Sequence, residues 1–219
     1  MDLIKYLFDF VLHLDKHLAE IILHYGTLTY AILFGVIFAE TGFVFTPFLP
    51  GDSLLFAAGT LASRGSFNVY FLFALLASAA IIGDNVNYWV GRKLGTKLFE
   101  LNTRFLKKEY LDKTHKFYEK HGGKTIILAR FFPIIRTFSP FVAGLGKMSY
   151  LRFVLNDIAG GVIWVGMFVF GGYFFGNLPF IQKNFSLVII AIILISIIPA
   201  TSEFIRHKMK KKPIPENNL

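Results

Sequence analysis

Six charged side chains lie within stretches of the sequence that are otherwise apolar. They are four acids and two arginines: Glu40, Asp52, Asp84, Arg130, Arg136 and Asp157. A charged group at membrane depth costs at least a few kcal/mol unless it is paired or hydrated. Residues placed at such a cost are candidates for function, because perturbed charges concentrate at functional sites.

Two of the acids flank one helix-breaking segment, and the two arginines flank another. Burial raises the pKa of a carboxyl group, so that it can exchange protons near neutral pH, whereas a neighbouring arginine acts in the opposite direction. An arginine keeps its charge when buried, and its planar fork binds phosphate through two hydrogen bonds. We therefore expect Glu40 and Asp52 to carry protons, and Arg130 and Arg136 to bind the phosphate of an anionic substrate. The alternative is that these residues form ion pairs that only hold the two segments together.

The other two acids, and a set of helix breakers, are expected to support this site. For Asp84 and Asp157, helix packing and function both stay open, and Asp84 is placed with the supporting residues. Proline and glycine break or reshape helices. The supporting breakers are Pro47, Pro50, Gly51, Pro133, Pro140 and Gly144.

The sequence carries no pattern that indicates catalysis. The six histidines do not cluster with acids, and neither a GxxxxGK[ST] phosphate-binding loop nor a GxSxG nucleophile motif is present. We therefore expect no catalytic residue, no metal and no cofactor, and a transporter rather than an enzyme.

The composition indicates that these charges lie in a membrane protein. Of 219 residues, 54% are hydrophobic and only 17% are charged, with 26 Phe and no Cys. A soluble domain has about a quarter of its residues charged. The composition excludes a disordered chain, a disulfide-stapled secreted domain and an ordinary nucleic-acid-binding domain, so no nucleic-acid partner is expected.

The net charge of +9 lies in two polar segments. Residues 92–124 carry +6 and residues 203–219 carry +3, while the rest of the chain is neutral. Cytoplasmic segments of membrane proteins are enriched in Lys and Arg. This distribution predicts that both segments, and therefore the C-terminus, are cytoplasmic.

Hydropathy and helix breakers predict an all-α membrane domain over residues 1–205, followed by a basic tail over 206–219. Its segments are an amphipathic helix (3–25), a re-entrant hairpin (27–62), a spanning helix (67–90), a basic surface helix (92–123), a second re-entrant hairpin (125–146) and two spanning helices (150–176 and 184–204). The first hairpin arm reaches only about 20 Å at 1.5 Å per residue. A bilayer core is about 30 Å thick, so the arm is too short to cross it.

The order of these segments indicates an internal duplication. A surface helix, a re-entrant hairpin and a spanning helix occur twice, and one further spanning helix follows. Because each unit crosses the bilayer once, its copy must be inverted. Direct sequence similarity is confined to faint matches such as Gly91-xxx-Gly95 and Gly172-xxx-Gly176.

Three blocks of the sequence resemble the signature of the DedA family of membrane proteins, also called the SNARE-associated or VTT-domain family. The blocks are Glu40-Thr41-Gly42 with Pro47-Phe48-Leu49-Pro50-Gly51-Asp52, then Gly83-Asp84 with Tyr88 and Gly91-Arg92, then Arg130-Phe131 with Ile134-Ile135-Arg136 and Pro140-Phe141-Val142-Ala143-Gly144. Asn87 departs from the family pattern, in which glycine is expected.

The resemblance implies a multi-pass protein of the bacterial inner membrane with two opposed re-entrant hairpins. Members of the family are linked to lipid flipping, notably of the undecaprenyl phosphate carrier, and to homeostasis of the proton motive force. The family's essential acids and arginines map onto Glu40, Asp52, Arg130 and Arg136.

The resulting hypothesis is a lipid translocase driven by the proton motive force. Its expected partners are a polyprenyl phosphate or phospholipid, protons and membrane lipids, and a homo-oligomer is left open. A proton-coupled cation or drug antiporter that supports membrane potential and pH homeostasis is the alternative. An enzyme such as a lipid phosphatase and a purely structural protein are weaker alternatives.

Overall fold

The computed structural model describes residues 14–43, 50–100 and 122–194, and every element within these ranges is helical. The helices are α2 (Leu14–Tyr25), α3 (Leu28–Gly42), α4 (Gly51–Ser63), α5 (Val69–Glu100), α7 (Lys124–Ala129), α8 (Pro133–Leu145), α9 (Tyr150–Phe175) and α10 (Pro179–Lys183), followed by a helix over Phe185–Leu194. The expectation of an all-α protein is confirmed for this part of the chain.

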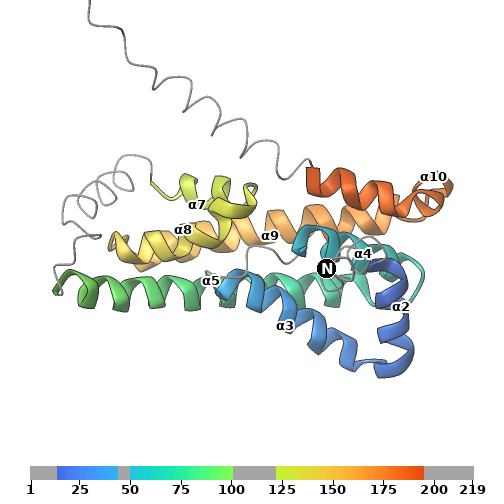
Figure 1. Ribbon diagram of the computed structural model, residues 1–219, viewed down its shortest axis with the longest axis horizontal. Coiled ribbons are helices and arrows are strands. Elements are labelled where there is room, and N and C mark those ends of the chain that lie inside the picture. The colour runs from blue at the N-terminus through green and yellow to red at the C-terminus, as the bar shows by residue number, and fades with distance from the viewer. Residues whose placement is uncertain (1–13, 44–49, 101–121, 195–219) are drawn as a thin grey trace, which may run out of the picture.

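Two helices, α5 and α9, are long and apolar enough to cross a membrane. Their apolar stretches, Val69–Leu94 and Tyr150–Phe175, have 26 residues each. At 1.5 Å per residue each reaches about 39 Å, more than the bilayer core of about 30 Å. The two helices pack against each other and run in opposite directions (Figure 1). They form the frame on which the shorter helices are arranged.

Each predicted hairpin contains the expected break between two short helices. The first break separates α3 from α4, and Pro50 directly precedes α4. The second lies at residues 130–132, and Pro133 opens α8 at a position where a missing N–H removes no helical hydrogen bond. Pro140 lies inside α8 and does not end it. Pro47 lies outside the described residues.

The short helices are shared between the two long ones. Helix α3 packs on α5 while α4 packs on α9, and conversely α7 packs on α9 while α8 packs on α5. Figure 1 shows α3 and α4 toward one end of the long-helix pair and α7 and α8 toward the other. Each of these helix pairs therefore contacts both long helices.

Reciprocal glycines bring α4 and α9 together. A Cβ atom at Gly59 of α4 would lie 2.1 Å from the Val169 carbonyl oxygen, and one at Gly172 of α9 would lie 2.0 Å from the Phe56 carbonyl oxygen. The α5–α8 contact is built in the same way: Gly91 meets the Phe141 carbonyl, and Gly144 meets the Tyr88 carbonyl. Only glycine allows the helix backbones to approach this closely.

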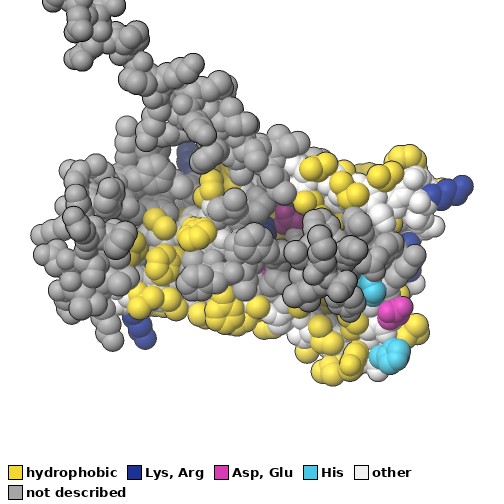
Figure 2. Space-filling view, viewed as in Figure 1, with side chains coloured by type: hydrophobic (Ala, Val, Ile, Leu, Met, Phe, Trp, Pro, Cys, Tyr) yellow, Lys and Arg dark blue, Asp and Glu magenta, His cyan; other side chains and the backbone are white. Residues whose placement is uncertain are grey.

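Large apolar side chains fill the interior and also cover much of the exterior. The main core lies between α3, α4, α5 and α9, and Phe185 of the last described helix reaches it, with its ring 6.3 Å from that of Phe56. Figure 2 shows hydrophobic side chains on the surface of the described parts of the visible face, both near its middle and at its right-hand end. An apolar exterior around an apolar core is typical of a protein surrounded by lipid.

The helix limits differ from the prediction at α5. The sequence predicted a spanning helix over 67–90 and a separate basic helix from residue 92, whereas α5 continues without a break to Glu100. A charged side chain does not end a helix, and residues 91–100 contain no proline. Of the predicted segments, 3–13, most of 92–123 and the chain after residue 194 lie outside the described residues. The inverted repeat and the re-entrant placement of the hairpins remain predictions.

Candidate functional site

Arg136 lies between the two acids of the first predicted hairpin. Its Nη2 is 2.5 Å from Glu40 Oε1, and its Nη1 is 2.7 Å from Asp52 Oδ1. The side chains of Glu40 and Arg136 are 0% and 4% exposed, and that of Asp52 is 14% exposed. We call these three residues the Arg136 cluster. The structure thus joins three of the four main predicted site residues.

The positions of the three charged residues at helix ends explain why they form ion pairs. Glu40 lies near the C-terminus of α3, and Arg136 lies in the first turn of α8. Both positions are unfavourable, because a helix dipole repels an anion at its C-terminus and a cation at its N-terminus. Asp52, in contrast, occupies the favourable first turn of α4. Pairing with Glu40 and Asp52 therefore compensates for the position of Arg136.

Gly51 permits this arrangement. A Cβ atom at position 51 would lie 1.7 Å from Glu40 Oε2, so only glycine leaves room for the Glu40 carboxylate beside the start of α4. The expectation that Gly51 supports the site thus has a direct steric basis.

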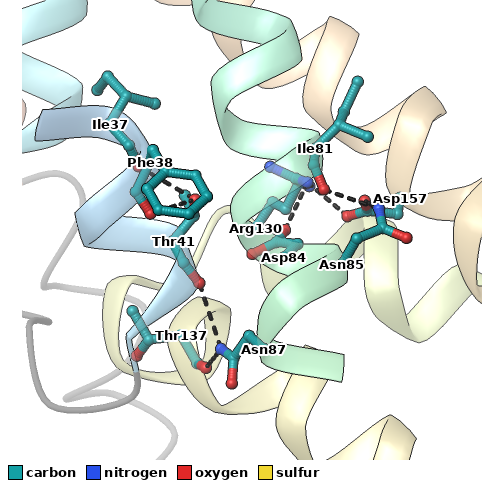
Figure 3. A network of polar contacts seen from close by, with 10 residues as sticks. All are labelled: Ile37, Phe38, Thr41, Ile81, Asp84, Asn85, Asn87, Arg130, Thr137 and Asp157. Atoms are coloured by element: carbon teal, nitrogen blue, oxygen red, sulfur yellow. Dashed lines mark hydrogen bonds and ion pairs between the residues drawn. The ribbon is translucent and has the colours of Figure 1, made fainter. Parts of the chain in front are cut away.

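Arg130 forms a separate cluster with the two acids whose role was left open. Its Nη2 is 2.5 Å from Asp84 Oδ2 on α5 and 2.5 Å from Asp157 Oδ1 on α9 (Figure 3). All three side chains are at most 2% exposed. We call these residues the Arg130 cluster. Arg130 is thus ion-paired with acids of the long helices, not with Glu40 or Asp52.

Trp164 lies at both clusters, and the sequence analysis did not single it out. Its indole N–H donates to Asp52 Oδ1 at 2.9 Å. The guanidinium carbon of Arg136 is 4.5 Å from the centre of a Trp164 ring, and that of Arg130 is 6.0 Å away. A buried tryptophan needs a partner for its N–H, and this was the one signal in the sequence that pointed to a polar neighbour.

Asn87, the departure from the family pattern, links the two predicted hairpins. Its amide nitrogen donates to the backbone carbonyl of Thr41 on α3 at 3.2 Å and to that of Thr137 on α8 at 2.7 Å (Figure 3). Asn87 is fully buried on α5. Its side chain therefore connects three helices next to the Arg136 cluster.

The two clusters contain more acids than bases, and some of their polar atoms lack partners. Two arginines face four carboxyl groups, so full ionisation leaves an excess of two negative charges. Among the described residues, Arg130 Nε, Arg130 Nη1, Arg136 Nε, Glu40 Oε2 and Asp84 Oδ1 are buried without a hydrogen-bond partner. Unpaired polar atoms are rare in protein interiors, so the clusters have unused capacity to bind a polar ligand or protons.

A groove on the outer side of α5 and α9 lies next to the Arg130 cluster. Its volume is about 570 Å³, and its walls are mainly apolar side chains of the two helices. Asn85 lines the groove, donates to Asp157 Oδ2 at 3.3 Å and accepts from the Tyr150 hydroxyl at 2.9 Å. The groove is therefore connected to the buried cluster through one amide side chain.

Within residues 14–43, 50–100 and 122–194, no group of three or more His, Cys, Asp and Glu side chains is placed to hold a metal ion.

The chain was compared with known protein families and proteins, and several relatives are named as membrane proteins. Residues 49–174 match the model of the VTT domain. Protein DedA of Escherichia coli (strain K12) is 57% identical over 95% of this chain and 96% of its own length. An uncharacterized membrane protein of Mycobacterium leprae (strain TN) is 46% identical over 75% of this chain and 74% of its own length. Inner membrane protein YqjA of Escherichia coli (strain K12) is 34% identical over 70% of each chain. No solved structure matches the chain.

Proposed function

The chain belongs to the VTT-domain, or DedA, family of membrane proteins, and from that premise we propose that it is a proton-coupled translocase of phosphate-bearing lipids. In this proposal it is a transporter rather than an enzyme. Its substrate is an anionic lipid such as undecaprenyl phosphate or a phospholipid. The observation that carries the proposal is the buried Arg136, which has one carboxyl group on each of its two terminal nitrogens.

The same nitrogen atoms of Arg136 are needed by a carboxylate and by a phosphate. A phosphate group binds a guanidinium through two parallel hydrogen bonds, and Glu40 and Asp52 occupy these donors in the structure. Protonation of the two acids removes their negative charge and weakens their hold on Arg136. Proton uptake therefore favours binding of the lipid phosphate, and proton release favours its departure.

Arg130 is the second proposed ligand of the phosphate. Both guanidinium groups lie over Trp164, and each retains at least one buried N–H without a described partner. The N-terminus of α8, next to Arg136, adds a partial positive charge. These groups supply the donors and the charge that a phosphate needs, while the prenyl or acyl chain stays in the bilayer.

The packing of the helices supports the duplicated, hairpin-based architecture. The glycine contacts between α4 and α9 have a counterpart between α5 and α8, as two inverted copies would require. Helix α3 is about 22 Å long, which is too short to span the bilayer core. We place the protein in the bacterial inner membrane, with several spans, rocking hairpins and a basic cytoplasmic C-terminus.

Reconstituted vesicles test this proposal. Purified protein is placed in vesicles with a pH gradient, and movement of a fluorescent polyprenyl phosphate between the leaflets is measured. Arg136→Ala and Arg130→Ala should each reduce transport at least tenfold. Arg152→Ala is the control, because Arg152 is exposed on α9. Full transport by both cluster variants would refute the role of the arginines.

The pH dependence of lipid binding tests the coupling directly. Binding of phosphatidylglycerol, whose phosphodiester keeps one charge throughout the range, should strengthen from mildly alkaline to mildly acidic buffer. In the double variant Glu40→Gln, Asp52→Asn, binding should depend less on pH than in the wild type, because the charges that compete for Arg136 are gone. Equal pH dependence in the wild type and the double variant would contradict proton coupling through these acids.

The excess of buried acids also fits the alternative of a proton-coupled cation or drug antiporter. Two carboxyl groups beyond the number of arginines provide negative charge for a cation. Proton flux driven by a sodium, potassium or drug-cation gradient, in vesicles without any phosphate-bearing substrate, would favour this function over lipid transport.

A further inference from the structure

We propose that the Arg130 cluster, formed by Asp84, Arg130 and Asp157, is a second proton-binding site that holds one proton between its two carboxyl groups. This inference deepens the proposed function and rests on it only for the part that the proton plays in transport. The proton site itself follows from the contacts, the burial and the charge balance of the three residues.

The contacts place two acids on one nitrogen atom. Asp84 Oδ2 and Asp157 Oδ1 each lie 2.5 Å from Arg130 Nη2. The two oxygens can therefore be separated by at most twice that distance. Two carboxylates at such a separation repel each other strongly in a medium of low polarity, and acid pairs of this kind retain a proton. The two acids thus form a close carboxyl pair that one arginine nitrogen bridges.

The charge balance leads to the same conclusion. With both acids ionised, the cluster carries one uncompensated negative charge, and its side chains are at most 2% exposed. An uncompensated buried charge costs several kcal/mol, whereas one bound proton makes the cluster neutral. Asp84 Oδ1 is buried and has no hydrogen-bond partner among the described residues, so it is available to carry that proton.

Among the described residues, no cation other than Arg130 is ion-paired with Asp84 or Asp157. Arg136 on α8 is near enough to act on Asp84, but it is already paired with Glu40 of α3 and Asp52 of α4. Two other titratable groups, Tyr150 and Lys93, line the adjoining groove, and Tyr150 donates to Asn85, which donates to Asp157. A proton is therefore the simplest neutralising partner for Asp84 and Asp157.

The groove between α5 and α9 supplies the route for this proton. Asn85 lies in the groove and donates to the Asp157 oxygen that Arg130 does not contact. An amide group does not relay protons, so the proton leaves a hydronium ion in the groove and forms an O–H bond on a carboxylate oxygen when Asn85 moves aside. Protonation weakens the hold of the acids on Arg130 and frees its donors for the phosphate.

Infrared spectroscopy of the purified protein in lipid nanodiscs tests the site without any transport. The carbonyl stretch of protonated carboxyl groups is recorded from mildly acidic to mildly alkaline buffer. Asp84→Asn and Asp157→Asn should each remove one protonated-carboxyl band, because the remaining acid is then neutralised by Arg130. Glu20→Gln is the control, since Glu20 is exposed on α2 and should leave the buried bands unchanged.

A second measurement uses a variant in which the Arg130 cluster is intact, so that detection of the band does not depend on the folding of Asp84→Asn or Asp157→Asn. Asp52→Asn protein is prepared with isotope-labelled aspartate, so that bands of its aspartates, Asp84 and Asp157 among them, shift while that of Glu40 does not; a shifted band is assigned to the cluster when Asp84→Asn or Asp157→Asn removes it. A shifted protonated band is expected. No shifted band at any pH, or an unchanged band in both cluster variants, would overturn the second proton site.

Proton counting separates this inference from the proposed function. With protonation at both clusters, the wild type should exchange about one more proton per bound head group than Asp157→Asn does. Lipid binding with the same proton count in both proteins would refute the second site and leave the lipid function standing. Protonated bands from Asp84 and Asp157 in a protein that moves no lipid would support the site and refute the function.

Discussion

The contact between α4 and α9 allows a sharp test with two adjacent glycines. We predict that Gly172→Ala destabilises the protein relative to Gly171→Ala. A Cβ atom at position 172 would lie 2.0 Å from the Phe56 carbonyl oxygen, whereas one at position 171 has no atom within 4 Å. The two substitutions share the same gain in helix propensity, about 1 kcal/mol. The difference between the variants therefore isolates the clash.

The size of the effect follows from the distance. A carbon atom approaches a carbonyl oxygen to about 3.3 Å, so α4 and α9 must separate by more than about 1 Å to accept the new methyl group. Overpacking of this kind costs about 1–3 kcal/mol, occasionally more. The clashing atom is part of a helix backbone and cannot rotate away, so we expect a difference near 3 kcal/mol, or about two orders of magnitude in the unfolding equilibrium.

Unfolding in detergent measures this difference. Purified variants in mild detergent are titrated with sodium dodecyl sulfate, and unfolding is followed by tryptophan fluorescence. The double variant Gly59→Ala, Gly172→Ala should cost less than the sum of the single variants, because one separation of the helices relieves both clashes. Equal stability of Gly171→Ala and Gly172→Ala, or strict additivity in the double variant, would refute this account of the interface.

Two further predictions concern buried side chains that join the clusters to the helices. Asn87→Ala should lower the free energy of unfolding by about 1–3 kcal/mol, because two buried backbone carbonyls lose their amide donor. Gln182→Ala, at an exposed position, is the control in the same unfolding titration. Equal stability of the two variants would count against the role of Asn87. Trp164→Phe should lower the free energy of unfolding by about 1.5–3 kcal/mol, because Asp52 loses the indole N–H donor. Differential scanning calorimetry measures this effect, and an unchanged melting temperature would exclude it.

The sequence predicted the charges of the site because charge in an apolar segment is costly wherever it occurs. Glu40, Asp52 and Arg136 were identified on this basis, and the structure brings them together. The partners of each charge could not be predicted, since hydropathy contains no information about which segments meet. The pairing of Arg130 with Asp84 and Asp157 depends on α5 and α9 lying side by side.

The helix breaks were predictable, but other features were concealed by ordinary residue types. Proline marked the starts of α4 and α8, because proline cannot continue a helix from its N-terminal side. Trp164 counts as an apolar residue in any hydropathy profile, so its role beside two arginines became visible only in three dimensions. Helix α5 joins the predicted spanning segment (67–90) to the start of the predicted basic helix (92–123), because no residue between them breaks the helix.

The ion pair between α3 and α8 joins residues that are synthesised at different times. Glu40 and Arg136 are separated by 96 positions in the sequence. At about 5–20 residues per second, a ribosome needs about 5–20 s to synthesise that length. During this interval Glu40, which lies in an apolar stretch, does not yet have its partner Arg136. We therefore expect Glu40 to stay protonated, hydrated or held by the insertion machinery until Arg136 is synthesised.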